Sequence, residues 1–358
     1  MRRENRVKLI IIGLVPVIYI LNIILEGLPE IVEKYYSTTI NKFIREALNM
    51  ITGWLPFSLA ELLYYFLVAL LIWFVVTTVV GIFKKRFINR FVNLLCYLSI
   101  LYILFMVLWG FNYQRQPLSD TLGYSSNSFI TSDLYNLCDH LIERANILRA
   151  EQVEDEKGVT AVPGGYKEVF TRLQDSYKQA GKEYKVFSGH YGSAKAIAIS
   201  PLMSYTGITG MYMPYTGEAN VNYNIPPFMW ASTAAHEMAH QRGFAREDEA
   251  NYIAYLVCSF SEEEDIQYSG VFLALIYSMN AMYREDQESY YQLRDKYSQG
   301  LLRDMKYNSD FWDKYQGRAE EISNNINDSY LKGNRQEDGV KSYGRMVDLL
   351  LAEYRDNH

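Results

Sequence analysis

The chain has 358 residues, 49% of them hydrophobic, which is enough for one large domain or two smaller ones. Its net charge of −6 is unevenly distributed along the sequence. Residues 1–90 hold 11 Lys/Arg and 6 Asp/Glu, whereas the remainder holds 24 Lys/Arg and 35 Asp/Glu. An acidic body argues against nucleic acid as a partner, because phosphate binding needs a basic face.

Three long apolar runs lie in the first 110 residues, at about 9–28, 62–83 and 91–110. A bilayer core about 30 Å thick needs roughly 20 apolar helical residues, so each run predicts a transmembrane helix. The first run could instead be a secretory signal, but no small-residue cleavage site follows it. We therefore expect contact with the lipid bilayer through a membrane domain over residues 1–110, followed by a second domain over residues 111–358.

The loop charges predict how these spans are oriented. Basic residues precede the first span and separate the second from the third: Arg2, Arg3, Arg6, Lys8, Lys84, Lys85, Arg86 and Arg90. The stretch from Glu26 to Glu61 carries three basic and five acidic residues. Because positive loops stay in the cytoplasm, we expect a multi-pass cell-membrane protein with a cytoplasmic N-terminus. Its C-terminal domain is then extracytoplasmic, and Thr39 to Ile51 could form a short helix lying on the membrane.

The second domain has apolar residues mostly at spacings of three and four, which predicts helices. The expected fold class is mainly α with a small β edge. Glu218, Asn220 and Asn222 alternate, so they share one face of an extended strand. Because asparagine is a poor strand former, we interpret this stretch as an edge or a binding face, with a polar turn as the alternative. A peptide could add to such a strand, which makes the three residues candidate substrate-binding groups.

The strongest chemical signal is His236-Glu237-Met238-Ala239-His240. Pro226-Pro227 can open a helix here and Gly243 can end it. Residues four apart share a helix face, so both imidazoles can bind one metal ion. Glu237 lies one step round the helix, where it can act as general base toward a metal-activated water. The alternative is a solvated helix with two incidental histidines.

Catalytic zinc normally takes three protein ligands and keeps a position for water. Glu247, Asp248 and Glu249 follow the histidines and supply three carboxylates. Glu247 shares a helix face with small residues that allow close packing, so we choose it first, Glu249 second and Asp248 third. Asn251, one turn after Glu247, could orient a ligand histidine. Two histidines, one carboxylate and water suit Zn²⁺ well.

The run Glu247-Asp248-Glu249-Ala250-Asn251 resembles the Glu-x-x-Ala-Asp/Asn signature of gluzincins, zinc peptidases whose third ligand is glutamate. The gap from His240 is shorter than in that group, and Arg246 stands where metzincins have a third histidine. The whole chain resembles the bacterial domain of unknown function 3810 family. The resemblance is carried by four segments: 109–113 (Trp-Gly-Phe-Asn-Tyr), 214–220 (Pro-Tyr-Thr-Gly-Glu-Ala-Asn), 236–251 and 342–351. It implies a membrane-bound, zincin-like protein and no established substrate.

The sequence therefore predicts a zinc metallopeptidase acting on peptides or proteins. The alternative is a zinc-stabilised binding or sensor module without turnover, which would not need Glu237. Tyr343 is the first choice as oxyanion donor, with Arg345, Tyr212 and His190 as further candidates. An intramembrane protease is disfavoured by the charges around the motif. Whether Cys138 and Cys258 pair stays open at this point.

Overall fold

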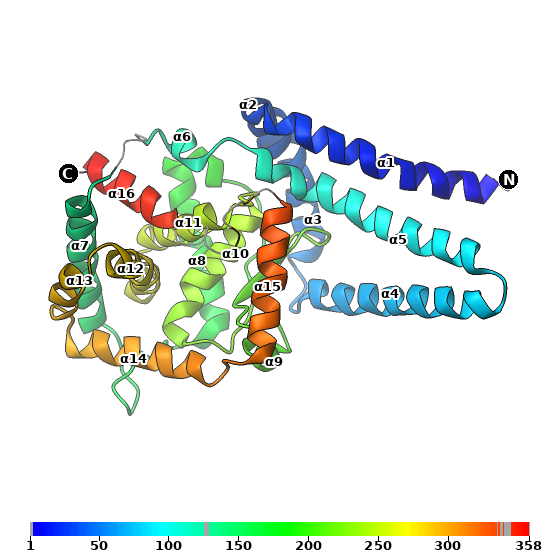
Figure 1. Ribbon diagram of the computed structural model, residues 1–358. Coiled ribbons are helices and arrows are strands. Elements are labelled where there is room, and N and C mark those ends of the chain that lie inside the picture. Colours follow the sequence, from blue (N-terminus) through cyan, green and yellow to red (C-terminus); the bar gives the residue numbers. More distant parts are fainter. Residues whose placement is uncertain (1–2, 125–128, 335, 337–338, 340–344, 358) are drawn as a thin grey trace.

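The computed structural model describes residues 3–124, 129–334, 336, 339 and 345–357. Three long helices project from one side of a helical body, with the N-terminus at their far end (Figure 1). They are α1 (Arg3–Glu26), α4 (Leu59–Phe83) and α5 (Phe87–Leu108). Each is long and apolar enough to cross a membrane, so the three predicted apolar helices are confirmed.

The three long helices form a small bundle in which α5 contacts both α1 and α4. The helix α4 begins at Ser58, whose Oγ accepts a hydrogen bond from the Glu61 N–H at 3.0 Å. Such an N-cap satisfies one of the four unpaired N–H groups of a first helical turn. Most side chains of the bundle are not covered by protein, as expected of helices that face lipid.

The segment between α1 and α4 is helical almost throughout, in α2 (Pro29–Ile31), the π-helix η1 (Val32–Ile40) and α3 (Asn41–Thr52). The helix α3 has an unusual distribution of side chains. A polar stripe of Asn41, Arg45, Asn49 and Thr52 is buried against the body. Large apolar side chains are exposed in and just after α3: Phe43, Met50, Ile51 and Trp54.

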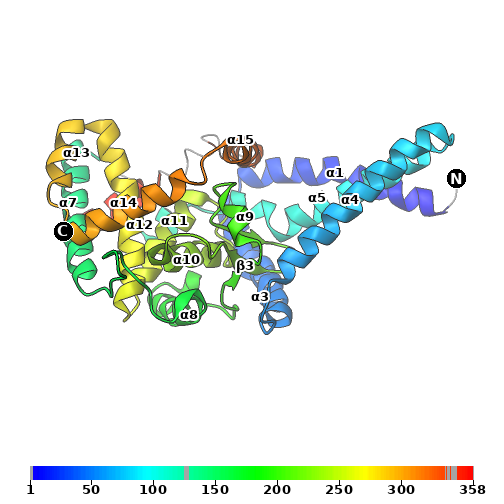
Figure 2. The ribbon, with the colours of Figure 1, turned by 90° about the horizontal axis from the view of Figure 1, so that it is seen from below.

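The body contains one three-stranded sheet with the order β1-β3-β2, formed by β1 (Lys195–Ala196), β2 (Gly210–Met213) and β3 (Glu218–Val221). The strand β3 pairs parallel with β1 and antiparallel with β2, so β3 is the central strand and β2 is an edge. Figure 2 shows this sheet between the body helices and the start of α4. The prediction of a mainly helical fold with a small sheet is confirmed.

The hydrophobic core is built around α10 (Trp230–Gln241), α11 (Glu247–Ser259) and α12 (Glu264–Glu285), which pack on one another. The remaining helices surround these three: η2 (Gly110–Gln114), α6 (Leu118–Leu122), α7 (Thr131–Ala150), α8 (Gly165–Glu183), η3 (Lys185–Phe187), α9 (Ser200–Ser204), η4 (Pro227–Met229), α13 (Gln287–Arg294), α14 (Gln299–Asp313), α15 (Arg318–Gly333) and α16 (Met346–Asn357). Cys96, Cys138 and Cys258 are buried free thiols, so Cys138 and Cys258 do not pair in this structure.

Candidate metal centre

The helix α10 presents both histidines of the motif on one face. Its small neighbours Ala234, Ala235 and Ala239 are fully buried, which lets α11 and β3 approach closely. Gly243 ends the helix in the left-handed conformation with φ 86°, which a residue without a Cβ adopts freely. Two backbone hydrogen bonds close this end: Gly243 N–H donates to His240 O and Phe244 N–H to Ala239 O. The chain therefore turns back at once, and α11 begins only seven residues after the second histidine.

Three potential metal ligands meet in the space created by this turn. Glu247 Oε2 lies 3.1 Å from His236 Nε2 and 3.5 Å from His240 Nε2. One donor atom from each of the three residues lies within 4.8 Å of the other two. Two imidazoles and one carboxylate form a donor set that suits zinc with a remaining position for water. The residues present therefore fit a metal ion.

The second ring nitrogen of each histidine has its own partner. His236 Nδ1 lies 2.9 Å from Asn251 Oδ1, and His240 Nδ1 lies 2.6 Å from the carbonyl oxygen of Phe244. An oxygen acceptor at Nδ1 selects the tautomer that carries its proton there, which leaves Nε2 free to bind a metal. Asn251 Nδ2 in turn donates to the Tyr277 hydroxyl at 3.3 Å, so the amide orientation is also fixed.

The charges at this centre are strongly coupled. Burial lowers the pKa of His240, but the charge and hydrogen bond of Glu247 outweigh burial and raise it to about 9. Burial raises the pKa of Glu247, but the two histidines hold it well below its usual range. The metal-free centre is therefore an ion pair, and a metal ion must displace the proton from His240.

Glu237 lies on the same helix beside this group and is 4% exposed. Its Oε2 has no hydrogen-bond partner within the described part of the chain. Burial raises its pKa to about 7, although both histidines and a backbone hydrogen bond from Tyr212 on β2 lower it. Gly210 on β2 is required for this close approach, because a Cβ there would lie within 2.4 Å of Glu237 Oε1.

The two other carboxylates considered as third ligand are bound elsewhere. Glu249 Oε1 accepts hydrogen bonds from the Leu118 N–H at 2.8 Å and from Arg246 Nη1 at 3.1 Å. Asp248 Oδ2 lies 3.7 Å from Arg345 Nε. Of the three acids, Glu247 is the one that the structure groups with the histidines.

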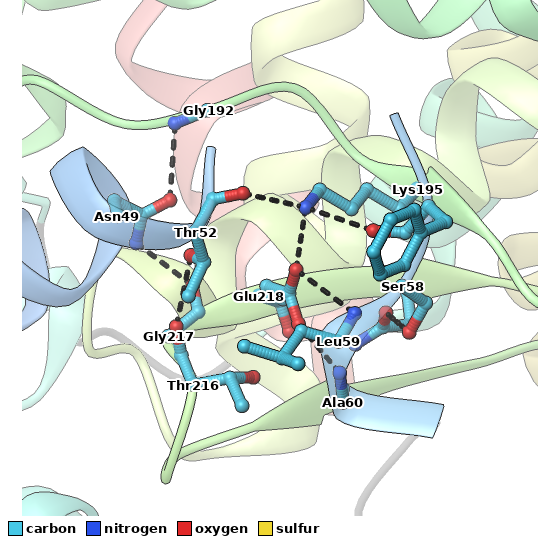
Figure 3. A network of polar contacts seen from close by, with 12 residues as sticks. Asn49, Thr52, Ser58, Leu59, Ala60, Gly192, Lys195, Thr216, Gly217 and Glu218 are labelled. Atoms are coloured by element: carbon cyan, nitrogen blue, oxygen red, sulfur yellow. Dashed lines mark hydrogen bonds and ion pairs between the residues drawn. The ribbon is translucent and has the colours of Figure 1, made fainter. Parts of the chain in front are cut away.

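The residues predicted to bind substrate lie in a different environment. Glu218 and Asn220 are at most 2% exposed, and Asn222 is fully buried. Glu218 accepts hydrogen bonds from the N–H groups of Leu59 and Ala60 at the start of α4 and forms an ion pair with Lys195 (Figure 3). The predicted edge position is incorrect for these residues, because β3 is the central strand.

The polar partners of Asn220 and Asn222 are also inside the protein. Asn220 Oδ1 accepts a hydrogen bond from Ser58 at 2.6 Å, and Asn222 Nδ2 donates to the carbonyl of Ile208 at 3.0 Å. Glu218 and Asn220 join the body to the start of α4, whereas Asn222 bonds only within the body. We name Glu218, Asn220 and Lys195, with the first turn of α4, the membrane joint.

The candidate oxyanion donors are placed as follows. Tyr343 lies outside the described residues, and Arg345 faces Asp248. The Tyr212 ring packs on Trp109 with centroids 4.9 Å apart. The backbone N–H of His190 donates to Glu46 of α3 at 3.2 Å, in a loop beside that helix.

Three aromatic residues beside the metal centre were not singled out for a role from the sequence. Trp109 packs edge-on against His240, with ring centroids 5.5 Å apart. The Tyr330 hydroxyl on α15 accepts hydrogen bonds from Trp109 Nε1 and from the Tyr113 hydroxyl, both at 3.2 Å. Burial is the main cause of the raised pKa of Tyr113, and the charge of Glu247 adds to it. Trp109 and Tyr113 belong to the Trp-Gly-Phe-Asn-Tyr segment that carries the family resemblance, and this segment was the sequence signal that could have found them. No sequence signal pointed to Tyr330.

The fold and the site geometry define a mainly helical protein with three helices long and apolar enough to span a membrane and a His-His-Glu group that could hold a metal ion. The chain belongs to the family described as "Protein of unknown function (DUF3810)", whose model matches residues 36–351. No curated protein and no solved structure matches it. The family assignment covers the metal centre, the membrane joint and two of the three long helices, but it brings no activity.

Proposed function

We propose that this protein is a membrane-anchored, zinc-dependent metallopeptidase that hydrolyses peptide bonds in peptide or protein substrates. The observation that carries the proposal is Glu237, a buried carboxylate with an unpartnered oxygen beside a three-donor group. Zinc held by His236, His240 and Glu247 supplies Lewis-acid chemistry when bound. A site that only stabilised the fold would have no use for this additional carboxylate.

In this proposal Glu237 is the general base. It takes a proton from the attacking water and later gives it to the leaving amine. Burial raises its pKa to about 7, and a group with a pKa near the working pH can both accept and release a proton. Asn251 and the Phe244 carbonyl hold the two imidazoles in orientation.

The substrate in this proposal lies along β2 and not along β3. The strand β2 is an edge of the sheet and packs on α10. A backbone hydrogen bond joins its Tyr212 to Glu237, so the edge and the general base are adjacent. A peptide that adds to this edge in extended form would pass the metal centre.

A hydroxyl donor is needed for the oxyanion that peptide hydrolysis produces. We propose Tyr343, as the sequence suggested, and add Tyr330 because its hydroxyl joins the aromatic residues beside the metal centre. Replacing each tyrosine by phenylalanine distinguishes the two: the variant that lacks the true donor has a lower kcat and unchanged bound zinc. We also propose a cytoplasmic N-terminus and an extracytoplasmic body, from the loop charges.

The experiment uses the full chain in detergent and measures bound zinc and hydrolysis of a fluorogenic peptide library. We expect one zinc per chain and chelator-sensitive hydrolysis, with both lost in His236→Ala/His240→Ala. Hydrolysis that persists in the zinc-free variant would sink the proposal. Stoichiometric zinc with no hydrolysis of any peptide would favour the zinc-stabilised binding or sensor module.

A further inference from the structure

A cavity of about 280 Å³ lies where the segment after α1 meets the body. It is lined in part by residues of η1 and α3 and by the turn that follows α10. Six of its lining side chains are charged: Glu33, Lys42, Arg45, Arg115, Lys185 and Arg242. The cavity therefore combines five cations with one carboxylate.

The carboxylate is already used by one of the cations. Both Glu33 oxygens accept hydrogen bonds from Arg115, at 2.7 and 2.8 Å. Within the described part of the chain, no carboxylate lies within salt-bridge distance of Lys42, Arg45, Lys185 or Arg242. Four positive charges in the cavity wall are therefore uncompensated.

The partners of these cations carry no net charge: backbone carbonyl oxygens, the Asn41 amide oxygen beside Arg45, and the rings of Tyr177 and Tyr191 beside Arg242. Arg45 Nη2 donates to the carbonyls of Ser37 and Arg242. Arg242 donates to the carbonyls of Phe187 and Met238, and Lys42 donates to that of Ser188. Carbonyl oxygens satisfy donors but carry no net charge, so the positive charge of the cavity persists.

Two of the uncompensated cations are deeply buried. Arg45 is 2% exposed and Arg242 is 4% exposed. A buried charge without an opposite charge is costly, and proteins normally pair it. Arg45 Nε and the Ser37 hydroxyl, which also lines the cavity, have no hydrogen-bond partner among the described residues.

From this geometry we infer that the cavity is a binding site for a phosphate group. Planar guanidinium groups match the oxygens of phosphate, and several cations around one anion give charge-assisted hydrogen bonds. Sites for larger organic ligands have volumes of roughly 300–1,000 Å³, so this cavity of about 280 Å³ is slightly smaller than that range. It suits a single anionic group better than an extended molecule.

The phosphate group has two sources, a lipid headgroup and free phosphate. The segment η1 is separated from the first long helix only by residues 27–31, and Phe43, Met50 and Trp54 are exposed in and just after α3. The cavity therefore lies at the membrane end of the body, where the headgroup of an anionic phospholipid can enter it. Inorganic phosphate from solution has the same chemistry and is the second source.

The same cavity borders the turn that orients the metal ligands. Arg45 donates to the carbonyl of Arg242, and Arg115 donates to that of Gly243 at 2.9 Å. The next carbonyl, that of Phe244, contacts His240. A bound phosphate group would thus neutralise Arg45, the one of these two arginines that has no carboxylate partner, and Arg45 is not a metal ligand.

The test uses the delipidated full chain, stripped of metal, in maltoside detergent, which contains no phosphate. Thermal stability is measured at constant ionic strength while inorganic phosphate or short-chain phosphatidylglycerol is added. A ligand of the folded state raises Tm in a saturable manner. The test variant is Lys42→Gln/Lys185→Gln, and the matched control is Lys178→Gln/Lys182→Gln, which removes two lysines of α8 that do not line the cavity.

We expect a saturable rise in Tm, with about tenfold more ligand needed in the cavity variant and no change in the control, because charge-assisted hydrogen bonds are lost. A response to phosphatidylglycerol alone identifies the lipid headgroup as the source, and a response to inorganic phosphate alone identifies free phosphate. The inference is overturned if neither ligand raises Tm. It is equally overturned if the cavity variant and the control respond alike.

Discussion

The metal centre and the membrane joint are both buried polar clusters built around a glutamate, yet they differ in one respect. At the joint, Glu218 bonds to Lys195 and to two helix N–H groups, so its bonding capacity is used within the protein. At the metal centre, Glu237 keeps an unpartnered oxygen, and three donor atoms converge on one point. Both clusters are buried and polar, and the metal centre differs from the joint because its unpartnered carboxylate oxygen lies beside three grouped donor atoms.

The largest expected effect comes from Glu237→Gln. We expect the rate of peptide hydrolysis to fall by about 10²–10⁴-fold, because an amide does not act as a general base. Zinc content should stay at the wild-type level, since Glu237 is not one of the three grouped donors. The check is kcat with bound zinc measured on the same sample. A variant that keeps its hydrolysis would show that Glu237 is as structural as Glu218.

The matching change at the joint is Glu218→Gln. We expect it to lower the free energy of unfolding by about 3–5 kcal/mol, because Lys195 is left without its charge partner in a buried site. Zinc content and kcat of the folded fraction should not change. Thermal or denaturant unfolding in detergent measures the free energy of unfolding. Bound zinc and kcat are measured per mole of titrated active protein. A selective loss of kcat would place Glu218 back among substrate-binding groups.

The metal centre and the membrane joint also differ in how far the sequence predicts them. The grouping of His236, His240 and Glu247 depends on helical spacing and one short turn, which are local. The three long helices follow from apolar length alone. Alternation in 218–222 predicted that Glu218, Asn220 and Asn222 share one face of a strand; Glu218 and Asn220 lie in β3, and Asn222 lies just beyond its end. The alternation did not show what covers that face, because Ser58, Leu59 and Ala60 are about 160 positions away in the sequence.

The same limit applies to the contacts beside the metal centre. Tyr330 meets Trp109 across 221 positions, and Arg45 meets the end of α10 across 197. Neither contact has a periodic signal, because each depends on how separate helices pack. The uncompensated charge of Arg45 is visible only after its neighbours are known.

A smaller effect is expected where an asparagine orients a ligand. Asn251→Ala removes the acceptor at His236 Nδ1, and we expect zinc affinity to fall by about 10–100-fold. Asn220→Ala at the joint removes a buried amide of the same type and should leave zinc affinity unchanged. Competition with a chelator gives both dissociation constants. Equal losses in the two variants would mean that Asn251 acts only through stability.

The pH dependence of zinc binding should change affinity only about tenfold per pH unit. The pKa of His240 is raised to about 9 in the metal-free protein, so below that pH a proton must leave before zinc can bind. We expect the apparent Kd to fall by about tenfold per pH unit between pH 7 and 9, and then to level off. Chelator-buffered zinc titrations at each pH measure this slope, and a Kd independent of pH would contradict it.

The stability of the metal-free protein should fall over the same pH range in which its affinity for zinc rises. A raised histidine pKa contributes stability that is fully present below the unfolded value of about 6.5 and is lost as pH rises through the folded value of about 9. The Tm of the metal-free chain should therefore fall over this range while that of the zinc-bound chain does not. In Glu247→Gln the decrease should disappear, because the charge of Glu247 is the main cause that raises the pKa. A fall in Tm of the same size in that variant would show that a group other than His240 causes the pH dependence. The pairing of a histidine with Glu247, which has no counterpart at Glu218 in the joint, would then not explain the pH dependence.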